Sequence, residues 1–297
     1  MALELTKIQD LMDAAKSGDR RSLSQLLTAI QSGEKIRETT SDPWTLGVTG
    51  PPGVGKSTLI GKLVERWKSS GERVAILAID PSSPITGGSL LADRIRMGEH
   101  ASGKDVFVRS IPLGKDSAGI SPFIAEMCSI LSECGWSRII IETVGAGQSE
   151  ISIIAFADRI LLIDGPDRGD IIQAEKAGLL EISDIIAVNK SDLPGAEAAA
   201  REIALSLSLV EGDDRKVHLV SAIEGHGIDG LIQEIESCNI NSASKILRMK
   251  QRLLASWNSL LTEHHEIDTL LAKLCDESIT VSDAIRHMAI TLEFGDE

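Results

Sequence analysis

Hydrophobic residues recur in short blocks from residue 44 onward, and seven of these blocks are rich in β-branched residues. Between them lie longer stretches with apolar residues three or four positions apart, which is the pattern of helices alternating with strands. Several blocks are apolar at nearly every position, as expected where both faces of a parallel strand are buried. The pattern predicts an α/β fold, a mostly parallel sheet with helices on both faces. The predicted strands are WTLGVT, RVAILAI, VFVRSI, RIIIE, RILLID, DIIAVN and VHLVSA.

Helical periodicity marks both ends of the chain. Apolar positions at 5–15 and 23–30 predict two short helices, with a break at 17–19 and Asp19 or Ser22 as the cap of the second. Similar spacing predicts a helix over 246–261 and two more near 270–274 and 285–289. We therefore expect three regions. These are an N-terminal helical extension at 1–40, a central α/β domain at 41–238, and a C-terminal helical extension at 239–297 that could serve as a dimerisation arm.

Composition narrows the classes of function. The formal net charge of −14 argues against nucleic acid as a partner, because phosphate binding needs a basic face. No apolar run approaches the roughly 20 residues that span a bilayer, and the N-terminus lacks an apolar signal segment. The four cysteines form no Cys-x-x-Cys pair, so free thiols are expected rather than disulfides or a zinc site. These features predict a soluble, cytoplasmic protein without membrane contact.

The segment GPPGVGKST, residues 50–58, fits G-x-x-x-x-G-K-[ST] and stands between a predicted strand and a predicted helix. Glycines at positions 53 and 55 tolerate unusual dihedrals, so backbone N–H groups can wrap a β-phosphate. Lys56 would neutralise β- and γ-phosphate oxygens, and the Ser57 hydroxyl would ligate Mg²⁺. The motif predicts a nucleoside triphosphate site, which makes the central region a P-loop domain. Its expected nucleotide contacts are Gly50, Gly53, Val54, Gly55, Lys56, Ser57 and Thr58.

The base is predicted from NKSD, residues 189–192, at the end of the strand DIIAVN. The Asp192 carboxylate can accept hydrogen bonds from N1–H and the exocyclic amine of guanine, whereas adenine offers no such pair. In a closed pocket adenine would leave that carboxylate unpaired. The amide of Ala222, in VSAIEG, is directed to guanine O6. We assign guanine recognition to Asn189, Lys190, Asp192, Ser221, Ala222 and Ile223, and expect GTP and GDP as the bound nucleotides.

Glu142 ends the predicted strand RIIIE, and Gly145 follows three residues later. In P-loop folds the strand beside the P-loop strand carries an acid that holds Mg²⁺, and such a glycine can meet the γ-phosphate. Mg²⁺ prefers several oxygen ligands, which adds Asp80 and Asp93 to Ser57 and Glu142. The alternative for Asp93 is an exposed helical acid. Gln148 could orient the attacking water.

The segments GVTGPPGVGKST, AIDPSSPITGGSLLADRIRM, IIIETVGAGQSE and VNKSDL together resemble the MeaB/ArgK family of P-loop GTPases. The resemblance implies a GTP-hydrolysing chaperone of an adenosylcobalamin-dependent acyl-CoA mutase of the methylmalonyl-CoA mutase type, which gates cofactor loading and protects or reactivates the mutase. It also implies a homodimer formed by the C-terminal arm, and a mobile loop with functional charges at Asp170 and Lys176. A solvated turn and helix face is the alternative for those two. The expected catalytic residues are Lys56, Glu142, Gln148, Asp170 and Lys176.

Two other functions stay open. One is a metal-delivery GTPase serving a nickel enzyme, although His264 and His265 lie in the tail and Cys128 and Cys134 in a predicted helix, away from the nucleotide motifs. The other is a kinase of transport proteins, as the name ArgK suggests, although no segment resembles a catalytic H-R-D. Neither alternative changes the predicted GTP site.

Overall fold

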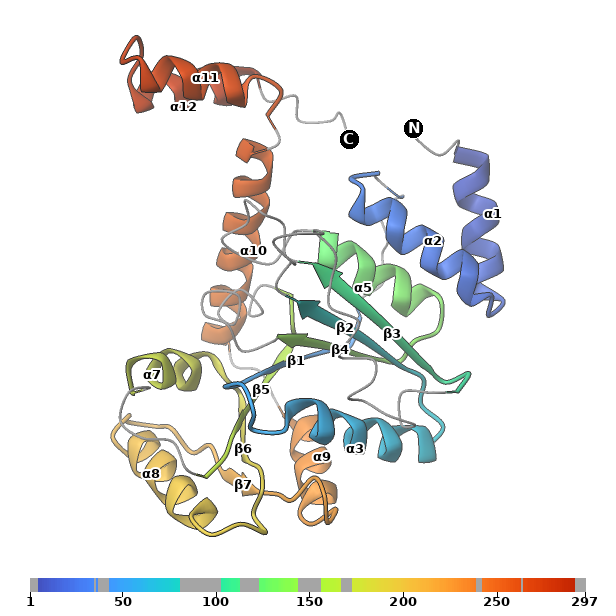
Figure 1. Ribbon diagram of the computed structural model, residues 1–297, viewed down its shortest axis with the longest axis vertical. Coiled ribbons are helices and arrows are strands. Elements are labelled where there is room, and N and C mark those ends of the chain that lie inside the picture. Colours follow the sequence, from blue (N-terminus) through green and yellow to red (C-terminus); the bar gives the residue numbers. More distant parts are fainter. Residues whose placement is uncertain are drawn as a thin grey trace.

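The computed structural model describes residues 5–34, 36, 43–80, 103–112, 123–143, 156–166, 173–238, 242–262 and 264–291. Its centre is a seven-stranded sheet in the order β3-β2-β4-β1-β5-β6-β7, with every neighbouring pair parallel (Figure 1). The α/β class and all seven predicted strands are confirmed. The strands are β1 (Thr45–Thr49), β2 (Val74–Asp80), β3 (Val106–Pro112), β4 (Arg138–Thr143), β5 (Arg159–Asp164), β6 (Ile185–Val188) and β7 (Val217–Leu219).

Parallel pairing brings the carboxyl ends of the strands to one edge of the sheet, which is where ligands bind in open α/β folds. The central strand β1 leads into the P-loop and pairs on one side with β4, where Val48 lies opposite Glu142. On its other side β1 pairs with β5. Strand β2 is the outer neighbour of β4, so the strands that end near Glu142 and Asp80 are adjacent. The predicted phosphate and magnesium motifs therefore meet at one edge.

Helices cover both faces of the sheet (Figure 1). Alternate residues of β2 point into different cores: Ala75 and Leu77 into one, Val74 and Ile76 into the other. Because each face is buried, the strands carry apolar residues at nearly every position. The first core is closed by α1 (Leu5–Lys16), α2 (Arg20–Gln31) and α5 (Phe123–Glu133), the second by α3 (Lys56–Ser69) and α9 (Ile228–Ser237). Helices α7 (Gln173–Ile182) and α8 (Ala196–Ser208) pack near β5, β6 and β7.

The two predicted N-terminal helices, α1 and α2, are confirmed, and they pack together as a hairpin. Asp19 caps α2, because its carboxylate accepts hydrogen bonds from the N–H groups of Arg21 and Ser22. Arg20 reaches the outer strand of the sheet and donates to the carbonyl oxygen of Val106. The hairpin is thereby fastened to β3, whose edge would otherwise expose unpaired backbone groups.

The C-terminal helices are α10 (Ser242–Thr262), α11 (Ile267–Cys275) and α12 (Val281–Thr291). Helix α10 runs away from the domain, and α11 and α12 lie together at its far end (Figure 1). The N-terminal part of α10 is held on the domain by Arg248, which is 4% exposed. The Arg248 guanidinium donates to the Asp184 carboxylate and to the carbonyl oxygen of Asp158. The helices predicted for the tail are confirmed. Within the described part of the chain, no helix combines the length and hydrophobicity needed to cross a membrane.

Candidate nucleotide-binding site

Three glycines give the P-loop its shape. Gly50, Gly53 and Gly55 have φ angles of 139°, 80° and 91°, a region that side chains rarely permit. A Cβ on Gly50 would lie 2.0 Å from the carbonyl oxygen of Ile163, and one on Gly55 would lie 2.5 Å from Nδ2 of Asn189. The loop is therefore pressed against β5 on one side and against the guanine motif on the other.

Helix α3 starts directly after the loop. Gly55 provides no side-chain cap, so the first amides of α3 remain donors for an anion. The Lys56 ammonium is buried and donates to the carbonyl oxygens of Gly50 at 2.5 Å and Pro51 at 3.1 Å. Thr58 is exposed in the first turn of α3, and Val54 is buried beneath the loop. The Lys56 ammonium, the backbone amides of the loop and the N-terminus of α3 together form a positively charged site that fits phosphate groups.

Ser57 and Glu142 bring two oxygen donors together beside this site. The Ser57 hydroxyl donates to Oε1 of Glu142 at 2.9 Å, and the carboxylate is only 5% exposed. Hard oxygen donors suit Mg²⁺, so this pair fits the predicted ion and would hold it, where it would neutralise phosphate charge. Asp80 ends β2 at the same edge, two residues beyond Ala78, which pairs with Glu142.

Several predicted residues cannot be placed against this pair. Asp93, Gly145, Gln148 and Asp170 lie outside the described residues, and Lys176 lies in α7 with its side chain outside them. Their assigned roles stay predictions.

Asn189 joins the phosphate loop to the guanine motifs. Its buried side chain donates from Nδ2 to the carbonyl oxygen of Val54 at 2.8 Å. Its Oδ1 accepts the N–H of Ala222 at 3.0 Å. The Ala222 amide, which we expected to donate to guanine O6, donates to Asn189 in this structure. A bound base would therefore share this N–H with Asn189 or replace Asn189 as its acceptor.

The Asp192 carboxylate has a fixed orientation. The Ser221 hydroxyl donates to Oδ1 of Asp192 at 2.5 Å, and the same hydroxyl accepts the N–H of Glu224 at 3.2 Å. Lys190 adopts a φ of 62° and its ammonium donates to the carbonyl oxygen of Gly53 at 2.8 Å. Ile223 is exposed. The residues assigned to the base and those assigned to the phosphates are therefore linked by direct hydrogen bonds.

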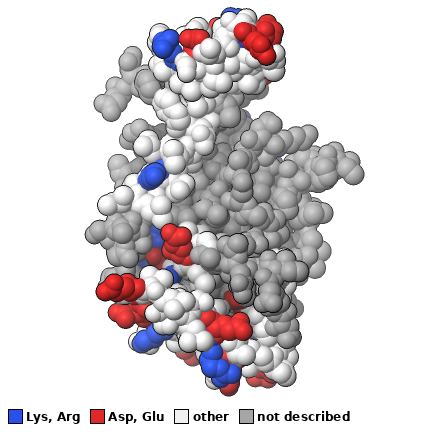
Figure 2. Space-filling view, turned by 90° about the vertical axis from the view of Figure 1, so that its left-hand side faces the viewer, with Lys and Arg blue, Asp and Glu red and all other residues white. Residues whose placement is uncertain are grey.

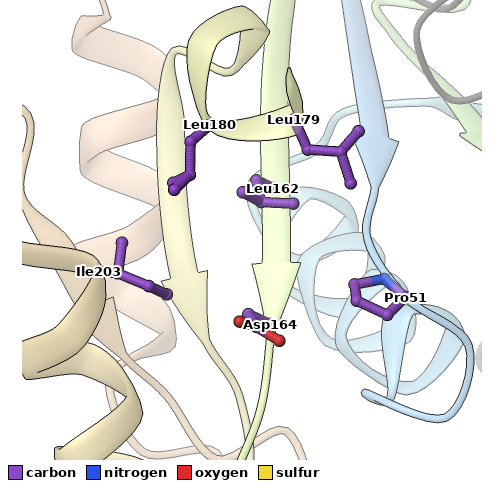
Figure 3. Close-up of a pocket in the computed structure, with 6 residues that line it drawn as sticks. All are labelled: Pro51, Leu162, Asp164, Leu179, Leu180 and Ile203. Atoms are coloured by element: carbon purple, nitrogen blue, oxygen red, sulfur yellow. The ribbon is translucent and has the colours of Figure 1, made fainter. Parts of the chain in front are cut away.

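Asp164 belongs to this constellation, although the sequence analysis did not assign it. It is buried at the end of β5, where its carbonyl oxygen accepts the Asn189 N–H at 2.8 Å and its carboxylate accepts the Gly165 N–H at 2.9 Å. Together with Pro51 of the P-loop and Leu179 of α7, it lines a small apolar pocket with a volume of about 10 Å³. Figure 3 shows these side chains around the pocket. The sequence contains the pattern that would have identified Asp164, because the strand RILLID ends on an acidic residue just as RIIIE does.

The cysteines lie apart from the nucleotide motifs. Cys128 and Cys134 are buried free thiols in and after α5, and burial raises the pKa of Cys128 to about 12. In the described ranges, no set of three or more His, Cys, Asp or Glu side chains has the arrangement of a metal site.

Comparison with known proteins places the chain among GTPases. Residues 5–275 match the family model of the methylmalonyl Co-A mutase-associated GTPase MeaB. The chain is 41% identical over 210 residues to a putative GTPase of Pyrococcus abyssi, an alignment that covers 68% of this chain and 65%, just under two thirds, of that protein. It is 35% identical over 289 residues to a putative GTPase of Pyrococcus horikoshii, covering 93% of this chain and 89% of that one.

Two further matches differ in kind. A segment of the fused isobutyryl-CoA mutase of Cupriavidus metallidurans is 33% identical over 205 residues, which covers 65% of this chain and 19% of that protein. The crystal structure of an LAO/AO transport system kinase has a TM-score of 0.63 at 21% identity, and the match covers 97% of this chain and 98% of that chain. At this identity the likeness supports the fold alone.

Proposed function

The chain belongs to the MeaB family of GTPases, and on that premise we propose that it binds GTP with Mg²⁺ and hydrolyses it to GDP and phosphate. The observation that carries the proposal is the 2.5 Å hydrogen bond that fixes the Asp192 carboxylate, beside an asparagine that holds the P-loop. A carboxylate held in one orientation can accept both donors of a guanine edge. The same arrangement would leave adenine unmatched.

Each residue of the phosphate site has a role in this proposal. Lys56 and the loop amides bind the β- and γ-phosphates, while Ser57 and Glu142 hold the magnesium ion. Gly145 meets the γ-phosphate and Gln148 orients the attacking water. Phosphoryl transfer needs mainly positioning and charge stabilisation, so the isolated protein should turn over slowly until a partner completes the site.

The proposed partner is an adenosylcobalamin-dependent acyl-CoA mutase of the methylmalonyl-CoA mutase type. The description of the family supports this, and so does a relative in which a segment similar to this chain forms part of a fused isobutyryl-CoA mutase. In this proposal GTP hydrolysis gates cofactor loading and protects or reactivates the mutase in the cytoplasm. The charges of Asp170 and Lys176 would connect the partner to the nucleotide.

We also propose that the chain forms a homodimer through α10. Large apolar side chains are exposed along this helix, and Figure 2 shows a mostly uncharged surface there, between the charged surfaces above and below. Such a stripe is typical of a helix that packs against another subunit. The exposed apolar residues of α10 are Ile246, Leu247, Met249, Leu253, Leu254, Trp257 and Leu260.

The first experiment measures GTP hydrolysis by the pure protein with and without a cobalamin-dependent mutase from the same source, together with co-sedimentation. We expect a complex and a faster rate in its presence. Hydrolysis without complex formation would leave the GTPase proposal standing and overturn the choice of partner. Lys56→Ala is the matched control, because it removes the cation that binds the phosphates and should abolish both signals.

A second experiment tests the base pocket alone. Asp192→Asn turns one acceptor oxygen into a donor, which should move the preference from guanine nucleotides toward xanthine nucleotides. Competition binding with GDP and XDP measures the ratio. An unchanged preference for GDP would overturn the assignment of Asp192.

A further inference from the structure

The turn between α10 and α11 contains a histidine whose two ring nitrogens are both engaged. His264 is 5% exposed. Its Nε2 lies 2.8 Å from the hydroxyl oxygen of Thr291, at the last described turn of α12, and its Nδ1 accepts the backbone N–H of Glu266 at 3.2 Å. The ring therefore ties the turn that follows α10 to the start of α11 and to α12.

The partners of His264 define its protonation state. A backbone N–H can only donate, so Nδ1 must present a lone pair. The Thr291 hydroxyl donates to the carbonyl oxygen of His287 at 2.9 Å, which leaves its oxygen to accept from Nε2. Every polar atom of the ring is satisfied by the neutral imidazole with its proton on Nε2. A proton added to Nδ1 would face the Glu266 N–H, donor against donor, at a buried position.

The acid whose charge acts on a protonated His264 is Glu266, and this carboxylate interacts more strongly with His287. The Glu266 carboxylate is engaged with Nε2 of His287 at 2.5 Å, and this bond holds the pKa of Glu266 below its usual range. The His265 ring stacks on His264 at 4.7 Å and would add like charge. Of the other acids in this hairpin, Asp276 bonds Ser278 and Asp283 bonds Thr280 and Arg286, while Asp268 and Glu277 are exposed to solvent. Glu263, the preceding residue, lies outside the described part.

Apolar packing at this corner is small. The buried core of the α11–α12 hairpin consists of Leu270, Ala284 and Met288, and α10 contributes the partly buried Leu261. A cluster of this size contributes only a few kcal/mol, so the polar links weigh heavily in the local stability.

We propose that this corner is a pH-sensitive latch, in which neutral His264 holds α12 against the turn between α10 and α11 and protonation of the ring releases it. The latch is closed at neutral pH and opens when acidification protonates the ring. It lies at the end of the surface that we propose for the homodimer, but it does not depend on GTP binding or on dimer formation.

Hydrogen–deuterium exchange of the full chain, corrected for the intrinsic pH dependence of exchange, tests the latch between about pH 7.5 and pH 5.5. In the wild type, protection of α11 and α12 should fall by up to about tenfold for each pH unit below the transition, as one-proton linkage requires. Protection of β1 and α3 should not change over this range. Wild-type protection of α12 that is equal at both pH values would overturn the proposal.

Two variants test whether His264 is the group that takes up the proton. His264→Asn places an uncharged carbonyl oxygen near the position of Nδ1, so it can accept the Glu266 N–H without titrating and should abolish the response to pH. His265→Asn, the matched control, should keep that response. A pH response in His264→Asn equal to that of the wild type would overturn the proposal. If His264→Asn lacks the hairpin at every pH, the ring-nitrogen NMR shifts of wild-type His264 decide: the Nε2–H tautomer is expected at neutral pH, and a protonated or Nδ1–H ring would overturn the latch.

Discussion

At the scale of single residues, Gly50 is where the phosphate loop has least freedom. Gly50→Ala would force a Cβ to within 2.0 Å of the Ile163 carbonyl oxygen at a φ of 139°. Strain of about 1–3 kcal/mol or more should therefore weaken GDP binding at least tenfold by calorimetry. Gly53→Ala is the matched control, because a Cβ there meets no described atom within 4 Å and adds only the cost of a φ of 80°. Equal losses in both variants would contradict the contact with Ile163.

In the proposed base pocket, Ser221 would act through Asp192. Ser221→Ala removes the hydroxyl that donates to the carboxylate at 2.5 Å. A hydrogen bond to a charged group contributes about 1.5–3 kcal/mol, so the Kd for GDP should rise by about one to two orders of magnitude. Ser221→Thr keeps the hydroxyl and should bind GDP nearly as well as the wild type. If Ser221→Ala binds GDP with wild-type affinity, the hydroxyl does not orient the carboxylate in solution.

At the scale of elements, the sequence predicts what local pattern controls. The seven strands follow from continuous apolar runs, and the cap at Asp19 follows from the break before α2. The bond from Asn189 to Val54 joins residues 135 positions apart, and the bond from Arg248 to Asp184 spans 64. Such pairings depend on how the elements pack, which periodicity does not encode. Motifs thus predict which residues we assign to the nucleotide site, but not the hydrogen bonds that join these residues.

The docking of α10 depends on a buried ion pair. Arg248→Met would leave the Asp184 carboxylate, whose side chain is 11% exposed, without its cation. Breaking a buried pair by removing one partner costs about 3 kcal/mol, which should appear in the free energy of unfolding measured in urea. Lys250→Met, an exposed position on the same helix, should change that free energy by less than about 0.5 kcal/mol. A similar loss in both variants would show that the ion pair does not anchor the helix.

The buried thiols of α5 and of the turn after it should make the free energy of unfolding depend on pH in the alkaline range. Burial raises the pKa of Cys128 to about 12 and that of Cys134 to about 11, from an ordinary value of 9.0. Above pH 9 the unfolded chain loses thiol protons that the folded chain keeps, so the free energy of unfolding should fall as pH rises. Urea titrations between pH 8 and pH 10 measure the slope. Cys128→Ala should reduce the slope, whereas the control Cys275→Ala, at an exposed position, should not. An unchanged slope in Cys128→Ala would contradict the role of burial.

At the scale of the whole molecule, β5 and β6 connect two distant regions. Their carboxyl ends carry Asp164 and Asn189, the second of which we assign to guanine recognition. Asp158 and Asp184, which bond Arg248 of α10, come just before their amino ends. The C-terminal arm is therefore rooted on the same two strands that support the nucleotide motifs, at the opposite edge of the sheet.

The exposed face of α10 gives the last prediction. Leu253 is 69% exposed and lies in a row of apolar side chains on this helix. In a free monomer the exposure of this apolar row to water would be unfavourable. Leu253→Asp would place a charge in the centre of the proposed dimer interface and should convert a dimer to a monomer in sedimentation velocity, with GTP hydrolysis retained. Lys250→Asp is the control, because it adds the same charge at an exposed polar position of the helix. A dimer with a Kd of about 1 μM should be almost fully formed at a protein concentration of about 100 μM, because mass action favours association. A wild-type protein that sediments as a monomer at that concentration would contradict the proposed interface.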